Sequence, residues 1–102
     1  MFLNAYTLYD CKSLIYLPPF YASAHGQAVR MVMDLARDNT TQVGRYPTDF
    51  TLYCVGQWND ATGNLLPADI REHISDVVAL IPARQPGFFD QPDPVSANGS
   101  AK

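Results

Sequence analysis

The side chains that most often carry catalysis or bind metals are few in this sequence and widely spaced. There are two histidines, His25 and His73, and two cysteines, Cys11 and Cys54. Zinc sites and redox motifs place such residues within a few positions of one another, and no pair here has that spacing. We therefore expect no metal and no cofactor. Both cysteines are expected to be reduced and buried, with a disulfide as the alternative.

A pair of carboxylates is another arrangement that a small enzyme could use. Asp49 and Asp60 flank one predicted strand. A strand rises roughly 3.3 Å per residue, so carboxylates at its two ends are too far apart to act on one bond. Asp49 is expected to bind loop amides, and Asp60 to set a turn. Because no residue set meets the geometric requirements of an active site, the sequence indicates a non-enzymatic protein.

Aromatic side chains offer a different chemistry, because they are too numerous for one small core. The aromatic residues from which a surface platform could be built are Tyr6, Tyr9, Tyr16, Phe20, Tyr21, Tyr46, Tyr53 and Trp58. Combined with Lys12, Arg30 and Arg45, such rings suit the stacking of single-stranded bases, and they suit a protein interface equally well. The candidate nucleic-acid contacts are therefore Lys12, Arg30, Arg45, Tyr16 and Tyr46.

Gly26 and Arg30 lie near the start of a predicted helix. A helix amino terminus exposes free N–H groups and glycine permits close approach, so these residues could form an anion site. The alternative is that Gly26 allows close packing of the helix against a sheet while Arg30 pairs with Asp34 on the surface.

The elements that must position these residues begin with a strand over residues 2–9. A short edge strand is expected over 14–17, because Pro18–Pro19 removes two backbone donors. The next element is a helix over 24–37 with Ser23 as its cap. Its apolar face consists of Ala28, Met31, Val32, Leu35 and Ala36.

A hairpin is predicted over 50–66, with Asp60 beginning the turn and Gly63 supplying its left-handed residue. Apolar residues then recur at spacings of three and four, which favours a second helix over 68–80. The β-branched residues Val77–Val78 leave a strand there as the alternative.

These elements predict a single α+β domain over 1–82 with an antiparallel sheet, followed by an extended or disordered tail over 83–102. Within that proline-rich tail, Phe88–Phe89 could pack back onto the domain.

The composition narrows the class of partner. The chain has 102 residues, a net charge of −3 and only seven scattered Lys and Arg residues. Coating of nucleic acid through bulk charge requires clustered cations, so only a local basic patch remains open. Neither a leader peptide nor an apolar run of membrane-spanning length is evident, so we expect no membrane partner and a cytoplasmic location.

Five short motifs resemble a known family when taken in order. They are Tyr9-Asp10-x-Lys12, Tyr16-x-Pro18-Pro19-Phe20, Gly26-x-Ala28-x-Arg30, Pro47-x-Asp49-Phe50 and Gly56-x-Trp58-x-Asp60-x-Thr62-Gly63. Over roughly residues 3–66 the chain resembles the small nonstructural protein encoded by the fifth open reading frame of gokushovirus-type microviruses. These are bacteriophages with circular single-stranded DNA.

The resemblance implies a protein that binds DNA or acts in viral single-stranded DNA synthesis or genome packaging, in the cytoplasm of the infected bacterial host. Single-stranded DNA or the replication complex would then be its partner. The alternative is a protein-interaction module, as a small homo-oligomer, that docks on the replication initiator, a procapsid or a host factor without binding DNA directly. The resemblance supplies no catalytic residues.

Overall fold

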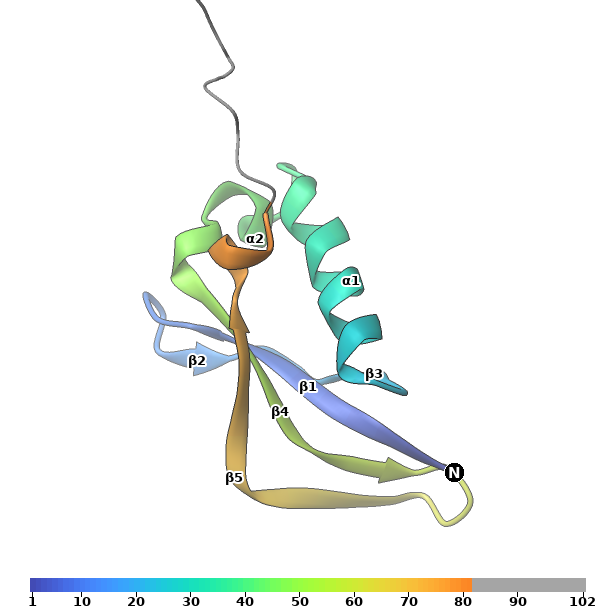
Figure 1. The fold of residues 1–102 in the computed structure, drawn as a ribbon. Helices are drawn as coiled ribbons and strands as arrows, with labels where there is room; N and C mark the ends of the chain where they lie inside the picture. The colour runs from blue at the N-terminus through green and yellow to red at the C-terminus, as the bar shows by residue number, and fades with distance from the viewer. Residues whose placement is uncertain (82–102) are drawn as a thin grey trace, which may run out of the picture.

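The computed structural model of this chain describes residues 1–81, in which one main helix packs across one face of a curled antiparallel sheet (Figure 1). The strands are β1 (Phe2–Asp10), β2 (Ile15–Tyr16), β3 (Phe20–Ala22), β4 (Phe50–Asn59) and β5 (Asn64–Asp76). The helices are α1 (His25–Arg37), α2 (Gln42–Arg45) and the 3₁₀ turns η1 (Pro47–Asp49) and η2 (Val77–Leu80). This arrangement confirms the predicted α+β class.

Strand β1 is the centre of the sheet, whose order is β2-β1-β4-β5. One edge of β1 pairs with β4 along its whole length. The other edge is shared by two short strands, because β2 pairs near Tyr9 and β3 pairs near Ala5. The break between β2 and β3 falls at Pro18–Pro19, which cannot donate backbone hydrogen bonds.

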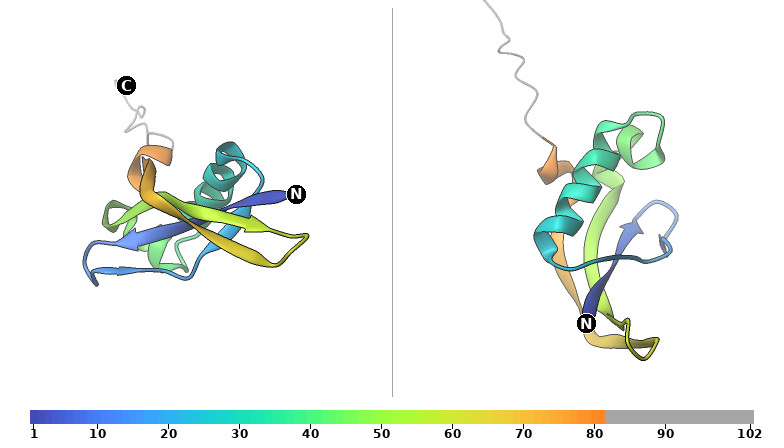
Figure 2. Two further views of the ribbon diagram at one scale, coloured as in Figure 1. Left: turned by 90° about the horizontal axis from the view of Figure 1, so that it is seen from below. Right: turned by 90° about the vertical axis from the view of Figure 1, so that its right-hand side faces the viewer.

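The core lies between the sheet and α1, as the alternation of β1 and β4 dictates. Tyr6 and Leu8 of β1 are buried on this side, as are Leu52 and Cys54 of β4. The helix contributes its buried residues Ala28, Val32 and Ala36. All the helical elements lie on the same side of the sheet (Figures 1 and 2). We call the opposite side, which no helix covers, the open face.

The predicted helix over 68–80 is wrong, because this stretch forms most of β5 and then the short turn η2. Its apolar residues do not share one face: Ile74 packs on the core, whereas Ile70 is 83% exposed. Pairing with β4, a contact that local periodicity cannot reveal, decides the outcome. The alternative of a strand in this stretch was therefore closer to the observed structure, although Val77–Val78, the residues that suggested it, lie in η2.

Two local predictions also need correction. Ser23 does not cap α1: the helix begins at His25 after Ala24, and Ser23 instead donates from its backbone N–H and its hydroxyl to Gln27 Oε1. In sequence, the run 38–41 together with Gly44 and Pro47 predicts only a connecting loop before the next strand. The structure instead places α2 there, and its N-cap Thr41 accepts a 2.9 Å hydrogen bond from the Gly44 N–H.

The short edge strand expected over 14–17 is present as β2. The tail expected over 83–102 lies outside the described residues. Within residues 1–81, no helix is long and apolar enough to cross a membrane.

Candidate functional site

Four ring side chains and one arginine meet on the open face, and we call them the tyrosine–arginine cluster: Tyr9, Tyr16, Tyr53, Arg71 and His73. The ring centroids of Tyr9 and Tyr16 are 4.6 Å apart, and those of Tyr16 and Tyr53 are 6.1 Å apart. The His73 ring meets Tyr53 edge-on at 5.8 Å. Arg71 Cζ lies 5.1 Å from the Tyr16 centroid and 5.6 Å from the Tyr53 centroid, within cation–π range.

Strand register brings this cluster together. Tyr9 is directly opposite Tyr16 on β2, and Tyr53 is directly opposite His73 on β5. Thr7, between Tyr53 and the β2 edge, is 3% exposed and donates a 2.6 Å hydrogen bond to the Leu17 carbonyl. Because alternate residues of a strand share a face, the side opposite the core collects these rings from four strands, β1, β2, β4 and β5.

The turn between β1 and β2 is fixed by Asp10. Its Oδ1 accepts hydrogen bonds from the backbone N–H of Lys12 and of Ser13, and its Oδ2 accepts one from the Ser13 hydroxyl. The Lys12 N–H is the main reason that the pKa of Asp10 lies below its usual range, and the Ser13 bonds add to it against the opposing effect of desolvation. Leu14, the next residue, has φ 61°. Asp10 thereby holds a strained turn that delivers Tyr16 to the cluster.

Arg71 reaches the cluster through an irregularity of β5. Gly56 pairs with Pro67 and Cys54 pairs with Glu72, so residues 68–71 face Val55 alone. Figure 1 shows the sharp bend of β5. Bulges of this kind redirect side chains, and here the residue that follows the bend lies over two tyrosine rings.

The open face has a second aromatic pair nearer the β4–β5 hairpin. Tyr21 lies opposite Ala5, Trp58 lies opposite Leu3, and their ring centroids are 6.1 Å apart. Leu3 and Thr7 are four residues apart on β1, which separates the two aromatic groups by about 13 Å. Aromatic side chains therefore lie at two positions along β1 on the open face.

The structure divides the site residues predicted from sequence. Tyr16 belongs to the tyrosine–arginine cluster, and Lys12 lies in the turn before it. Arg45 ends α2 and Tyr46 follows it on the helical side of the sheet (Figure 1), and neither is among the contacts of the cluster. Arg45 Cζ lies 6.0 Å from the Tyr46 centroid. Arg30 lies on the exposed side of α1.

Arg30, Met33, Asp34 and Arg37 line a shallow hollow on α1. The packing role suggested for Gly26 is wrong, because a Cβ at that position would meet no atom within 4 Å.

The two predicted turn residues lie in the β4–β5 hairpin. Gly63 has φ 76°, and its N–H donates to the Asn59 carbonyl at 2.8 Å. Asp60 Oδ1 lies 3.0 Å from the amino terminus of Met1. The hairpin therefore also holds the start of β1.

Sequence reasoning missed Arg71 and His73 as site residues. Both were assigned to a helix, in which they could not share a sheet face with Tyr53. The alternation of Thr51 and Tyr53 with the buried residues of β4 was the available signal, but the partner strand was unknown. The prediction of a buried Cys11 is also wrong, because it is exposed in a turn, whereas Cys54 is buried; both are free thiols.

A polar network links α1 to β5 on the helical side. The Tyr6 hydroxyl lies 2.6 Å from His25 Nδ1 and accepts a 3.0 Å hydrogen bond from Asn4 Nδ2. His25 Nε2 lies 3.4 Å from Glu72 Oε2. Burial raises the pKa of Tyr6, which is fully buried. The network therefore fastens the start of α1 to the sheet.

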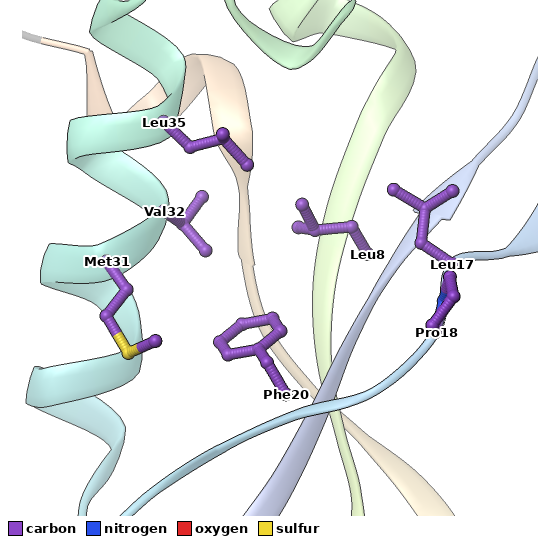
Figure 3. A pocket seen from close by; sticks show the side chains of 7 residues that line it. All are labelled: Leu8, Leu17, Pro18, Phe20, Met31, Val32 and Leu35. Carbon is purple, nitrogen blue, oxygen red and sulfur yellow. The ribbon is translucent and has the colours of Figure 1, made fainter. Parts of the chain in front are cut away.

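An apolar groove of about 410 Å³ opens between α1 and the β1–β2 side of the sheet (Figure 3). Its lining residues are Leu8, Leu17, Pro18, Phe20, Met31, Val32 and Leu35. Figure 3 shows side chains from α1 and from the strands converging on this space. It lies on the helical side and is separate from the tyrosine–arginine cluster.

The fold and the open face together define a small α+β protein with an exposed aromatic sheet surface, an arrangement suited to binding. Residues 3–80 match the family model described as Phage ORF5 protein. The chain therefore belongs to the phage ORF5 protein family and is a bacteriophage protein, as its motifs indicated. Neither a curated protein nor a solved structure matches it significantly.

Proposed function

We propose that this phage protein binds single-stranded DNA on its open face and acts in replication or packaging of the viral genome, in the cytoplasm of the infected bacterium. The observation that carries the proposal is the tyrosine–arginine cluster. Its Tyr16 is 43% exposed, and its Arg71 is also exposed.

Stacking supplies the attraction in this proposal. Every base has an aromatic face, and in a single strand these faces are free to stack on tyrosine rings, whereas a duplex hides them. Arg71 lies where its guanidinium can stack on a base or contact a phosphate. With a net charge of −3 on the chain, phosphate contacts are few, so the affinity should depend on salt only shallowly.

The proposed role is binding without catalysis. Tyr6, His25 and Glu72 are the arrangement closest to an acid–base relay among residues 1–81. Tyr6 has no exposed surface, and its hydroxyl already contacts two side chains. We therefore assign this network a structural role, in which it holds the start of α1 against the sheet.

The test is fluorescence anisotropy of a labelled single-stranded oligonucleotide titrated with wild-type protein, Tyr16→Ala and Tyr53→Ala. Loss of a stacking partner should weaken binding by about 1–3 kcal/mol in each variant. Tyr46→Ala is the matched control, since that tyrosine is 54% exposed on the helical side and should change nothing. A duplex oligonucleotide should bind more weakly. Equal affinities in all four proteins would contradict the proposal that the open face binds single-stranded DNA.

A second candidate function is protein interaction, either with a viral replication or capsid protein or with a second copy of the chain. Strand β5 favours it, because Leu65, Leu66 and Ile70 are 52%, 47% and 83% exposed on an edge strand. No binding to the oligonucleotide at low salt, together with a dimer in light scattering or capture of a viral protein, would make this the better function.

A further inference from the structure

The open face holds a second aromatic surface, formed by Tyr21 of β3 and Trp58 of β4, whose ring centroids are 6.1 Å apart. Tyr21 is 38% exposed, Trp58 is half-buried, and Leu65, the partner of Trp58 on β5, is 52% exposed. Neither aromatic residue belongs to the buried core cluster, so packing of the core does not account for them. An aromatic pair that stays accessible on a sheet can stack on a base.

This pair repeats the layout of the tyrosine–arginine cluster. In each group one ring comes from β4 and another from a short strand on the opposite edge of β1. Tyr9 and Ala5, the β1 partners of Tyr16 and Tyr21, are four residues apart, which corresponds to about 13 Å along the strand. Stacked nucleotides advance about 3.4 Å per step and an extended strand advances further, so about four steps or fewer connect the two groups.

The β1 residues between the two groups are small and uncharged. Ala5 and Thr7 share the open side of β1 and are 1% and 3% exposed. Their short side chains leave the surface low at this point, and they carry no negative charge that would repel a phosphate. A single strand can therefore follow β1 from one group to the other.

We propose that Tyr21 and Trp58 form a second base-stacking site, and that one DNA single strand lies along β1 and stacks a base on each aromatic group. This second site extends the proposed binding of single-stranded DNA to the open face, on which it rests. Two contacts on one strand bind more tightly than either alone, because the second forms at a high local concentration.

The second site differs from the first in its charge. Among the described residues, arginines lie over the rings of Tyr16, Tyr46 and Tyr53 and over neither ring of this pair. The second site therefore contributes stacking without an arginine, and its loss should lower the affinity without changing the salt dependence.

Trp58 is the single tryptophan of the chain, so its fluorescence reports directly on this site. The experiment titrates the full chain with an oligothymidine of about eight nucleotides, which is long enough to reach both groups. Tryptophan emission reports contact at Trp58, and anisotropy of the labelled oligonucleotide reports total binding. We expect both signals to change together, with one oligonucleotide bound per protein.

Three variants separate the two sites. Tyr21→Ala should weaken binding by about 5- to 150-fold, the loss of one stacking partner, with an unchanged slope of log affinity against log salt. In Tyr16→Ala the emission of Trp58 should still be quenched, at higher oligonucleotide concentrations. Tyr46→Ala, on the helical side, is the matched control and should reproduce the wild-type titration.

Four results would overturn the second site. If the oligonucleotide binds but the Trp58 emission and the affinity of Tyr21→Ala stay unchanged, only the tyrosine–arginine cluster binds DNA and the proposed function stands. Two oligonucleotides bound per protein would show that no single strand connects the groups. Absence of binding in both measurements would overturn the proposed function as well. Trp58 emission that changes on dilution without DNA would assign the pair to contact with a second copy of the chain.

Discussion

Asp10 shows how a single side chain can position the open face. It is 8% exposed and accepts three hydrogen bonds within the turn that follows β1. That turn includes Leu14 at φ 61°, a conformation that costs a residue with a Cβ roughly 1–2 kcal/mol. The hydrogen bonds of Asp10 offset this strain, and β2 then places Tyr16 against Tyr9.

The lowered pKa of Asp10 predicts a specific pH dependence. A group whose pKa is lower in the folded than in the unfolded state adds stability above its unfolded pKa, and that stability is lost as pH falls through its folded pKa. Asp10→Asn keeps the oxygen acceptor but cannot titrate. We expect the free energy of unfolding, measured in urea from neutral pH downward, to fall less steeply with acid in the variant.

The pKa of Asp38 is also lowered, mainly by the Thr40 hydroxyl. Because Asp38 is present in both proteins, its contribution to the pH dependence cancels when their stability curves are compared. Parallel stability curves for wild type and Asp10→Asn would contradict the role given to the Asp10 carboxylate.

At the scale of elements, the β4–β5 pair determines which residues face outward. The two strands approach so closely at Gly56 that a Cβ there would lie 2.3 Å from the carbonyl oxygen of Leu66. Just beyond this point β5 bends and delivers Arg71 to the open face. The glycine and the bend are therefore parts of one feature, a close approach followed by a bulge.

Gly56→Ala should destabilise the protein by about 1–3 kcal/mol, because the added methyl group would overlap the Leu66 carbonyl and force the backbone of the two strands to shift. Gly26→Ala is the matched control, since its Cβ meets no atom within 4 Å and alanine favours a helix over glycine by up to about 1 kcal/mol. Urea midpoints of the two variants should therefore move in opposite directions. A Gly56→Ala protein as stable as wild type would show that the strands separate easily here.

The whole molecule has two unlike sides. The helical side holds the core, the apolar groove and the Arg45–Tyr46 pair, whereas the open face holds the tyrosine–arginine cluster. An arginine therefore lies over a tyrosine ring on each side of the sheet. These two pairs allow the faces to be compared with matched substitutions.

Arg71→Ala should weaken oligonucleotide binding and lower the slope of log affinity against log salt by about one if Arg71 contacts a phosphate. Arg45→Ala removes the same charge from the helical side and should leave both quantities near their wild-type values. Anisotropy titrations over a salt series measure both. A larger loss in Arg45→Ala would move the binding surface to α2 and favour the contacts first predicted from sequence.

Local pattern was sufficient for much of the fold. The expected helix over 24–37 and the observed α1 agree to within one residue, because its apolar spacing reflects one buried face. The hairpin was also predicted, since strand alternation and a glycine turn are short-range signals. Tyr16 was named among the candidate contacts because the aromatic residues are too numerous for one small core.

The sequence by itself determined the composition of the open face: several tyrosines and few cations. Only the tertiary structure decided which of them meet. Arg71 and Tyr16 are 55 positions apart, and they come together because β5 pairs with β4, β4 with β1, and β1 with β2. Strand pairing depends on contacts between distant segments, whereas periodicity reports only the segment in which it occurs. For this reason residues 68–76 resembled a helix in sequence and form a strand in the structure.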